Sequence, residues 1–168
     1  MKGMKKAPTS RAQRADPVTT VHVQVACGSP GIPDARRIRR WARAALAGRR
    51  KETELTVRVV GAREGRMLNE RWRGLPSATN VLSFRALALT PVSGALGDIA
   101  LCAPVVSREA KAQGKAPAAH WAHLVIHGVL HLLGHDHANR RDAATMEALE
   151  VRILAGLGFP DPYAVVGM

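Results

Sequence analysis

The alternation of apolar and polar positions along the chain predicts four short strands. Residues 18–26 and 54–60 place a valine or leucine at nearly every second position, which is typical of a strand with one buried face. Residues 79–84 predict a third strand, and residues 98–102 predict a short fourth one. The stretch between these two contains proline, serine and glycine, which indicates a loop.

Apolar positions three and four residues apart predict helices between and after the strands. Asp34 is placed to cap the first helix, and Gly48 is placed to end it. In the second helix we expect Met67, Leu68 and Trp72 to face the interior. The predicted helices cover residues 34–47, 62–73, 104–113, 117–133 and 142–157.

These elements predict a single α+β domain of the α/β type, in which a small mixed four-stranded sheet packs against about five helices. The helix over residues 117–133 is apolar on almost every side, so we expect it to be buried. It also carries His127 and His131. A buried imidazole needs a hydrogen-bond partner or a metal ion, so this helix is the first place to look for chemistry.

His127 and His131 are four residues apart, which puts their Cβ atoms roughly 5–6 Å apart on one face of a helix. Two imidazoles at that separation can share one metal ion at about 2.0–2.1 Å each. Gly134 can end the helix in a left-handed turn, after which the chain can return His137 as a third ligand. Three nitrogens leave the fourth zinc position open, which is typical of a catalytic site at the end of a buried helix.

The same spacing occurs in metzincin proteases, in which the residue after the first histidine is the glutamate that acts as general base. Here that position is Gly128. A chain with Gly128 can bind zinc but lacks the protease's proton-handling group. Asp136 has two open interpretations, since it can orient a histidine ligand or simply cap the turn. For His120 and His123 we expect exposed or hydrogen-bonded side chains rather than metal ligands.

The chain carries a formal net charge of +12, which points to a polyanionic partner such as nucleic acid. Of its 25 Lys and Arg residues, 13 lie in the first 51 positions. Several of these lie on one side of the first predicted helix and include Arg36, Arg37 and Arg40. That side is either a solvated surface or a ridge that binds RNA phosphates, and both interpretations remain open.

The basic residues 1–16 lack apolar periodicity, which predicts a disordered tail before a domain over residues 17–168. No apolar run reaches the length of a membrane span, and the start of the chain has no apolar segment typical of secretion. Cys27 and Cys102 do not form a Cys-x-x-Cys motif or a disulfide framework. We therefore expect a cytoplasmic protein without a membrane partner.

Several ordered motifs between residues 54 and 163 give the chain a resemblance to the bacterial YbeY family of metal-dependent endoribonucleases. The histidine block is one of them, and the others lie before and after it at matching separations. They are Leu68-Asn69, Trp72-Arg73-Gly74, Ala78-Thr79-Asn80-Val81-Leu82-Ser83-Phe84, Leu96-Gly97-Asp98-Ile99, His120-Trp121-Ala122-His123-Leu124 and Met146-Glu147-Ala148-Leu149-Glu150.

The resemblance implies a single α/β-type domain with one zinc ion held by His127, His131 and His137. It also implies cleavage of single-stranded rRNA in 16S rRNA 3′-end maturation and ribosome quality control, with the small ribosomal subunit and its assembly factors as partners. The arginine that is important for activity in that family corresponds to Arg73. This chain differs from the family at His135, where tyrosine is common, so His135 is an alternative ligand or proton donor.

A second difference follows the third predicted strand, where Arg85 stands in place of the family's usual proline. Our leading hypothesis is a zinc-dependent endoribonuclease, with zinc or an activated water acting on the phosphodiester and Arg73 stabilising the developing charge. A metalloprotease-like hydrolase is one alternative. The other is a ribosome-assembly RNA-binding protein whose zinc is structural.

Overall fold

The computed structural model describes residues 17–87 and 94–165. The predicted tail over residues 1–16 and part of the loop after the third strand lie outside these residues. Within them the chain forms four strands and five helices, as predicted. In chain order they are β1 (Thr19–Val25), α1 (Ala35–Ala45), β2 (Thr53–Val60), α2 (Ala62–Arg73), β3 (Val81–Arg85), β4 (Ala95–Cys102), α3 (Ala103–Ala112), α4 (Pro117–Leu132) and α5 (Arg140–Gly156).

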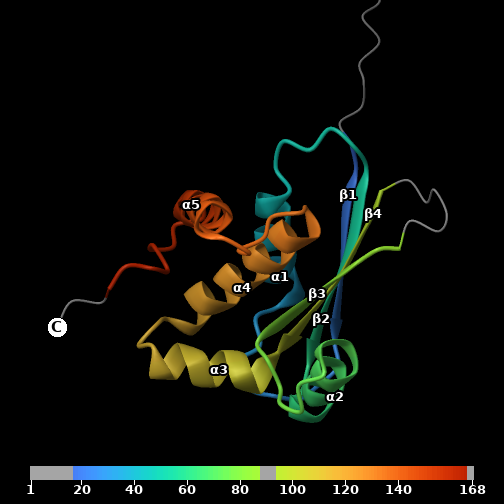
Figure 1. The fold of residues 1–168 in the computed structure, drawn as a ribbon, viewed down its shortest axis with the longest axis vertical. Coiled ribbons are helices and arrows are strands. Elements are labelled where there is room, and N and C mark those ends of the chain that lie inside the picture. Colours follow the sequence, from blue (N-terminus) through green and yellow to red (C-terminus); the bar gives the residue numbers. More distant parts are fainter. Residues whose placement is uncertain (1–16, 88–93, 166–168) are drawn as a thin grey trace, which may run out of the picture.

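The four strands form one mixed sheet in the order β1-β2-β4-β3 (Figure 1). β1, β2 and β4 run parallel, and β3 pairs antiparallel with β4 at the edge. On β2, Leu55, Val57 and Val59 are buried while Glu54 is exposed, so the predicted two-residue alternation is confirmed. The predicted fold class, a small mixed sheet with helices, is confirmed as well. The fourth strand is longer than predicted and begins at Ala95.

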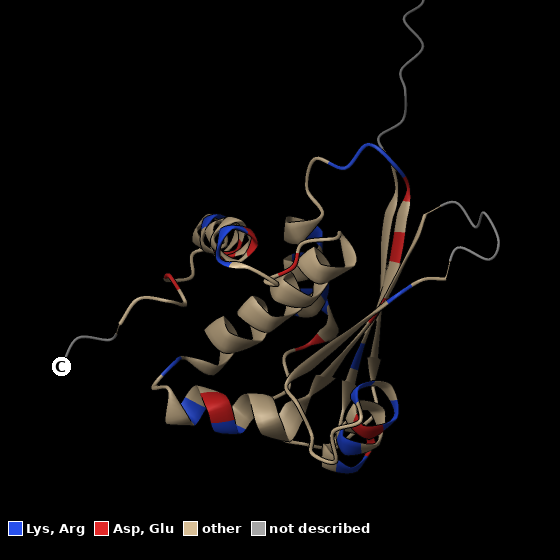
Figure 2. Ribbon diagram, viewed as in Figure 1, with Lys and Arg blue, Asp and Glu red and all other residues tan. Residues whose placement is uncertain are grey.

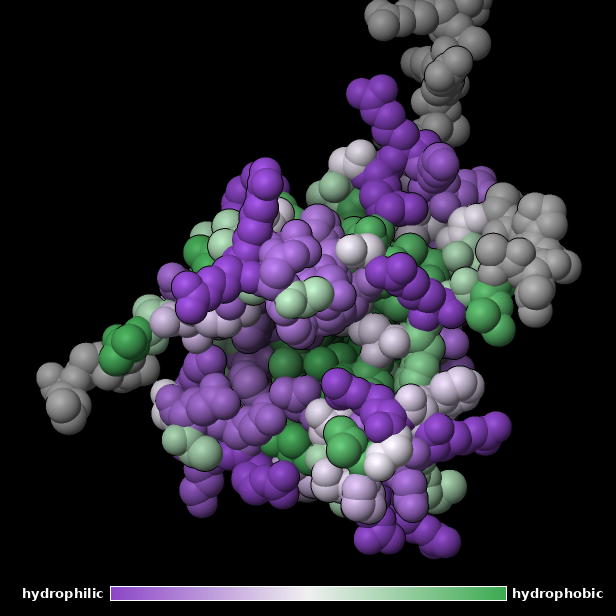
Figure 3. Space-filling model, in the orientation of Figure 1, coloured by the Kyte–Doolittle hydropathy of each residue, from purple (hydrophilic) through white to green (hydrophobic). Residues whose placement is uncertain are grey.

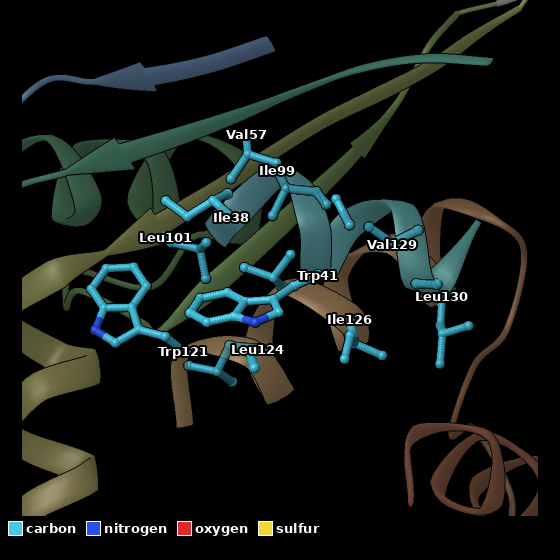
Figure 4. Packing of buried hydrophobic residues seen from close by; sticks show 14 of the residues in the cluster. Ile38, Trp41, Val57, Ile99, Leu101, Trp121, Leu124, Ile126, Val129 and Leu130 are labelled. Carbon is cyan, nitrogen blue, oxygen red and sulfur yellow. The ribbon is translucent and has the colours of Figure 1, made fainter. Parts of the chain in front are cut away.

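Helix α4 packs against the sheet and is buried along most of its length. Its Trp121 is 1% exposed and Val125, Ile126 and Val129 are fully buried, which confirms the predicted buried helix. Figure 4 shows Trp121 and Trp41 of α1 pointing into the same core, which also contains Ile99 and Leu101 of β4. Burying side chains of this size stabilises the fold by about 1.5–3 kcal/mol each. This packing therefore fixes the position of α4, and with it the positions of the side chains that α4 carries.

Helix α1 confirms two of the predicted local signals. The Oδ1 atom of Asp34 accepts a hydrogen bond from the backbone N–H of Arg37 at 2.8 Å, so Asp34 is the N-cap. Gly48 follows the helix with a φ of 84°, a conformation that favours glycine. Among the described residues, no helix has both the length and the apolar character needed to cross a membrane.

Helix α2 corrects one prediction. Met67 is 58% exposed and Trp72 is 60% exposed, whereas Gly65 and Asn69 are buried. A Cβ atom on Gly65 would lie 2.9 Å from Sγ of Cys102, so the helix contacts the sheet through its smallest residue. The side chain of Asn69 donates a hydrogen bond to the Ser77 carbonyl at 2.6 Å, which holds the following turn. Close backbone approach, rather than the apolar stripe, therefore decides which side of α2 faces inward.

Candidate functional site

The end of α4 places two of the predicted ligands. The Nε2 atoms of His127 and His131 are 3.1 Å apart, as expected for histidines one turn apart on one helix face. The helix then stops at Gly134, whose φ is 98°. The N–H of His135 bonds back to the Leu130 carbonyl at 3.0 Å, which closes a left-handed helix end of the Schellman type. This reversal brings His137 back to the other two histidines.

The three histidines form a group that fits a metal ion. One ring nitrogen from each of His127, His131 and His137 lies within 4.8 Å of the others. Two nitrogens bound to the same tetrahedral zinc at about 2.0–2.1 Å would be roughly 3.3 Å apart. The 3.1 Å between the first two histidines is close to that value. His131 and His127 are half-buried and His137 is exposed, so the group opens to solvent on one side.

Glu150 of α5 is a member of the site that the sequence reasoning missed. It is fully buried, and its Oε1 atom accepts a hydrogen bond from Nδ1 of His127 at 2.5 Å. Its Oε2 atom accepts hydrogen bonds from Nε2 of His123, at 3.0 Å, and from the hydroxyl of Tyr163. A signal was present in the sequence, because Glu150 lies four residues after buried Met146 and four before buried Leu154.

These bonds keep Glu150 ionised. Burial acts to raise the pKa of this carboxyl, but the hydrogen bonds from His123, His127 and Tyr163 outweigh burial and lower the pKa to about 2. The pKa of Tyr163 is raised by burial and by the neighbouring carboxylate, so its hydroxyl stays protonated and donates. A carboxylate on Nδ1 of His127 places the proton there and turns the Nε2 lone pair towards His131 and His137.

The second imidazole is favoured in its neutral form. Burial lowers the pKa of His131, and the neighbouring His127 and His137 lower it further, because a second proton close to these rings is unfavourable. Metal ligation requires the neutral imidazole, so this shift favours binding of an ion. His123, His127 and Glu150 also lie close enough together to hold an ion. Because His123 and His127 are both hydrogen-bonded to Glu150, we interpret Glu150 and His123 as the residues that hold the His127 ring in place.

The histidine group lies in a cleft of about 550 Å³ between the end of α4, edge strand β3 and the end of α2. Arg73 is the last residue of α2, where Gly74 turns the chain with a φ of 69°, and it lines this cleft together with all three histidines. His135 lines the cleft as well. Figure 3 shows recessed hydrophobic atoms between α4 and β3, with hydrophilic side chains around them.

The structure separates the remaining candidates. The Oδ1 atom of Asp136 accepts a hydrogen bond from the N–H of His137 at 2.7 Å, so its side chain caps the turn. His120 and His123 are buried and bonded to Glu109 and Glu150, in line with the expectation of hydrogen-bonded histidines. The three arginines predicted to bind RNA lie on α1 and do not line this cleft. These arginines are Arg36, Arg37 and Arg40.

Gly128 has a packing reason to be glycine. A Cβ atom at this position would lie 2.9 Å from Cγ2 of Ile99 and 3.3 Å from Cγ2 of Val81. The hydroxyl of Ser83 donates to the Gly128 carbonyl at 3.1 Å, so β3 and α4 approach closely here. The position where a metzincin carries its glutamate therefore faces the sheet, and no longer side chain fits without displacing β4.

The known proteins that are similar to this chain identify its family. The family model for the endoribonuclease YbeY matches residues 31–158, which include α1 to α5, Arg73 and the three histidines. The chain belongs to the YbeY endoribonuclease family. Proteins named endoribonuclease YbeY are similar to it throughout most of their length. The one from Stenotrophomonas maltophilia is 52% identical over 149 residues, which cover 86% of this chain and 92% of that protein.

A second YbeY relative, from Nitrosomonas eutropha, is 49% identical over 143 residues, covering 85% of this chain and 97% of that protein. Among solved structures, the solution structure of TM1509 from Thermotoga maritima has a TM-score of 0.53 and 18% identity. It covers 86% of this chain and 99% of the Thermotoga chain. At that identity the similarity shows the fold, and the family membership comes from the sequence relatives.

Proposed function

We propose that this protein is a zinc-dependent endoribonuclease that cleaves single-stranded rRNA during 16S rRNA 3′-end maturation and ribosome quality control. The observation that carries the proposal is the convergence of His127, His131 and His137 in one open cleft with Arg73, in a chain of the YbeY family. The cytoplasm is the proposed location, and the small ribosomal subunit with its assembly factors is the proposed partner.

Each residue of the cleft has a distinct task in this proposal. The three histidines hold one zinc ion, which when bound supplies a Lewis acid for a phosphate oxygen of the RNA. Glu150 keeps the proton on Nδ1 of His127, so that Nε2 of this ring stays available. Arg73 is an exposed guanidinium at the rim of the same cleft, where it can bind the reacting phosphate in a bidentate manner.

The charge of the protein supports an RNA substrate. Figure 2 shows Lys and Arg positions on the loop after α1 and on α2, α3 and α5, and acidic positions on the three helices as well. With a net charge of +12, the surface attracts RNA phosphates through release of counterions. The open face of the histidine group favours catalysis over a structural zinc, since structural zinc sites are closed by four protein ligands.

The decisive experiment is cleavage of a single-stranded 16S rRNA 3′-end fragment by protein of known metal content. Arg73→Ala and His131→Ala are compared with wild type, after circular dichroism and thermal unfolding show that both variants are folded. We expect each variant to cleave at least about a hundredfold more slowly, because each loses a group that stabilises charge in the transition state. Arg66→Ala is the matched control, since Arg66 is an exposed arginine of α2 outside the cleft.

Equal residual cleavage in wild type and both variants would contradict a histidine-centred nuclease and would favour the RNA-binding alternative. Cleavage of peptides by the zinc-loaded protein would favour the metalloprotease alternative instead. To test the rRNA role, purified small subunits with unprocessed 16S rRNA 3′ ends are compared with an unrelated single-stranded RNA. A preference for the subunits is the expected result, and equal rates would contradict a specific role in maturation.

A further inference from the structure

A pair of aromatic side chains, one exposed and one half-buried, lies at the rim of the histidine cleft. Trp72 of α2 and Phe84 of β3 have ring centroids 5.6 Å apart at an angle of 58°. Trp72 is 60% exposed, whereas the other two tryptophans, Trp41 and Trp121, are 3% and 1% exposed. An indole of this size normally contributes to a core or to a binding surface. Because most of the Trp72 side chain is exposed, it contributes little to the core, and its position at the cleft favours a role in binding a ligand.

The pair separates two hollows of the surface. One is the cleft with the three histidines, and the other is a hollow of about 760 Å³ on the outer face of the sheet, beside Arg58 and Asp98. Trp72, Phe84 and Arg85 line both of them. A linear polymer that extends from the histidine group onto the outer face of the sheet therefore passes over these side chains.

Three arginines lie near the pair. The guanidinium of Arg71 lies 5.5 Å from the centroid of the Trp72 ring, a cation–π contact. Arg73 and Arg85 are exposed at the same rim. Nη2 of Arg85 donates a hydrogen bond to the His131 carbonyl at 3.2 Å, which holds this guanidinium beside the histidine group. An aromatic ring between arginines suits a ligand that alternates flat rings with negative charges, as a nucleic acid strand does.

We propose that Trp72, supported by Phe84, is a stacking platform for one base of single-stranded RNA, and that it makes the protein prefer single strands over duplexes. This rests on the proposed function. An unpaired base can leave its stack and lay its face on an aromatic side chain, whereas a base within a duplex is covered on both faces by its neighbours. Arg73 and Arg85 then flank this base and bind the phosphates on either side of it.

The test is binding of a fluorescent 2′-O-methyl oligonucleotide, single-stranded or as a blunt duplex of the same length, to zinc-loaded protein. We expect Trp72→Ala to weaken single-strand binding roughly tenfold and to leave duplex binding unchanged, since the loss is one base stack. The salt dependence of binding should stay the same, because stacking releases no counterions. Trp72→Phe should retain most of the affinity. Met67→Ala is the matched control, because Met67 is 58% exposed on the same helix and lies outside the cleft.

A second measurement locates the stacked base. Single-strand binding should quench the tryptophan fluorescence of wild type, and this quenching should disappear in Trp72→Ala, since Trp41 and Trp121 remain buried. One abasic position in the oligonucleotide should weaken wild-type binding by the same factor as Trp72→Ala and should add nothing in that variant.

Three outcomes would overturn the platform. They are equal weakening of single-strand and duplex binding, a changed salt dependence, and unchanged single-strand affinity in Trp72→Ala. If any one of them occurs while wild type still cleaves single-stranded RNA and His131→Ala does not, the platform is wrong and the proposed nuclease function stands. If wild type neither binds nor cleaves RNA, the proposed function fails, and the platform fails with it.

Discussion

Replacing Glu150 with glutamine tests whether one buried carboxylate holds the histidine centre in place. Glu150 is fully buried and accepts hydrogen bonds from His123, His127 and Tyr163. Glutamine has nearly the same shape, but its amide end is a donor and faces one of these donors. The substitution therefore removes the charge and leaves at least one polar group unpaired in the interior.

The size of the effect follows from the pKa of Glu150, which is lowered from 4.5 to about 2. Since each pKa unit corresponds to about 1.36 kcal/mol, the ionised carboxylate adds on the order of 3 kcal/mol to the free energy of unfolding. A depressed pKa in the folded state gives stability that is fully present above the unfolded value of 4.5. That stability falls as the pH drops towards 2, and by pH 3 roughly 2 kcal/mol of it should be lost.

The assay is urea unfolding of metal-free wild type and Glu150→Gln at several pH values from 3 to 7. At pH 7 we expect the variant to be less stable by about 3 kcal/mol, and at pH 3 by about 1 kcal/mol. Glu147→Gln is the matched control, because Glu147 is an exposed carboxylate of the same helix and should show little change at either pH. We also expect Glu150→Gln to bind zinc about 10- to 100-fold more weakly, since the orienting bond to His127 is altered.

A stability difference that stays constant from pH 3 to pH 7 would refute the reasoning. It would mean that Glu150 contributes through its shape and packing, and that its charge is not what the three donors stabilise. Unchanged zinc affinity in the variant would separately refute its role in orienting His127.

Removal of the metal with a chelator should lower the melting temperature, and added zinc should restore it, because the ion binds only the folded protein; no shift on zinc addition would argue against the site. His137→Ala should weaken zinc binding at least tenfold in a calorimetric titration, whereas His135→Ala should have little effect; the reverse order would make His135 the third ligand. Gly128→Ala should destabilise the protein by about 1–2 kcal/mol in urea unfolding, because its Cβ would lie 2.9 Å from Cγ2 of Ile99. A more stable Gly128→Ala variant would show that β4 can move away.

Local pattern was enough to predict the elements and part of the site. The alternation on β2 and the apolar positions of α4 predicted both elements within one or two residues, because their periods match the geometry of a strand and a helix. The spacing of His127 and His131 predicted their shared face for the same reason. Gly134 predicted the end of α4 because its left-handed turn depends only on local backbone freedom.

Other features of the site depend on which elements meet in space. Glu150 is 23 positions from His127, and no local pattern in either segment predicts that α5 packs against the end of α4. Trp72 was predicted to face inward, because an apolar stripe does not reveal that α2 contacts the sheet through Gly65 instead.

The sequence by itself thus determined the strands, the helices and the spacing of the histidine ligands, because these depend on contacts between residues a few positions apart. Only the tertiary structure decided that Arg73 shares a cleft with the histidines, that Glu150 supports His127 and that Trp72 stays at the surface. Those results depend on packing between elements far apart in the chain. Such packing is selected by the fit of whole surfaces, and no single stretch of sequence carries that information.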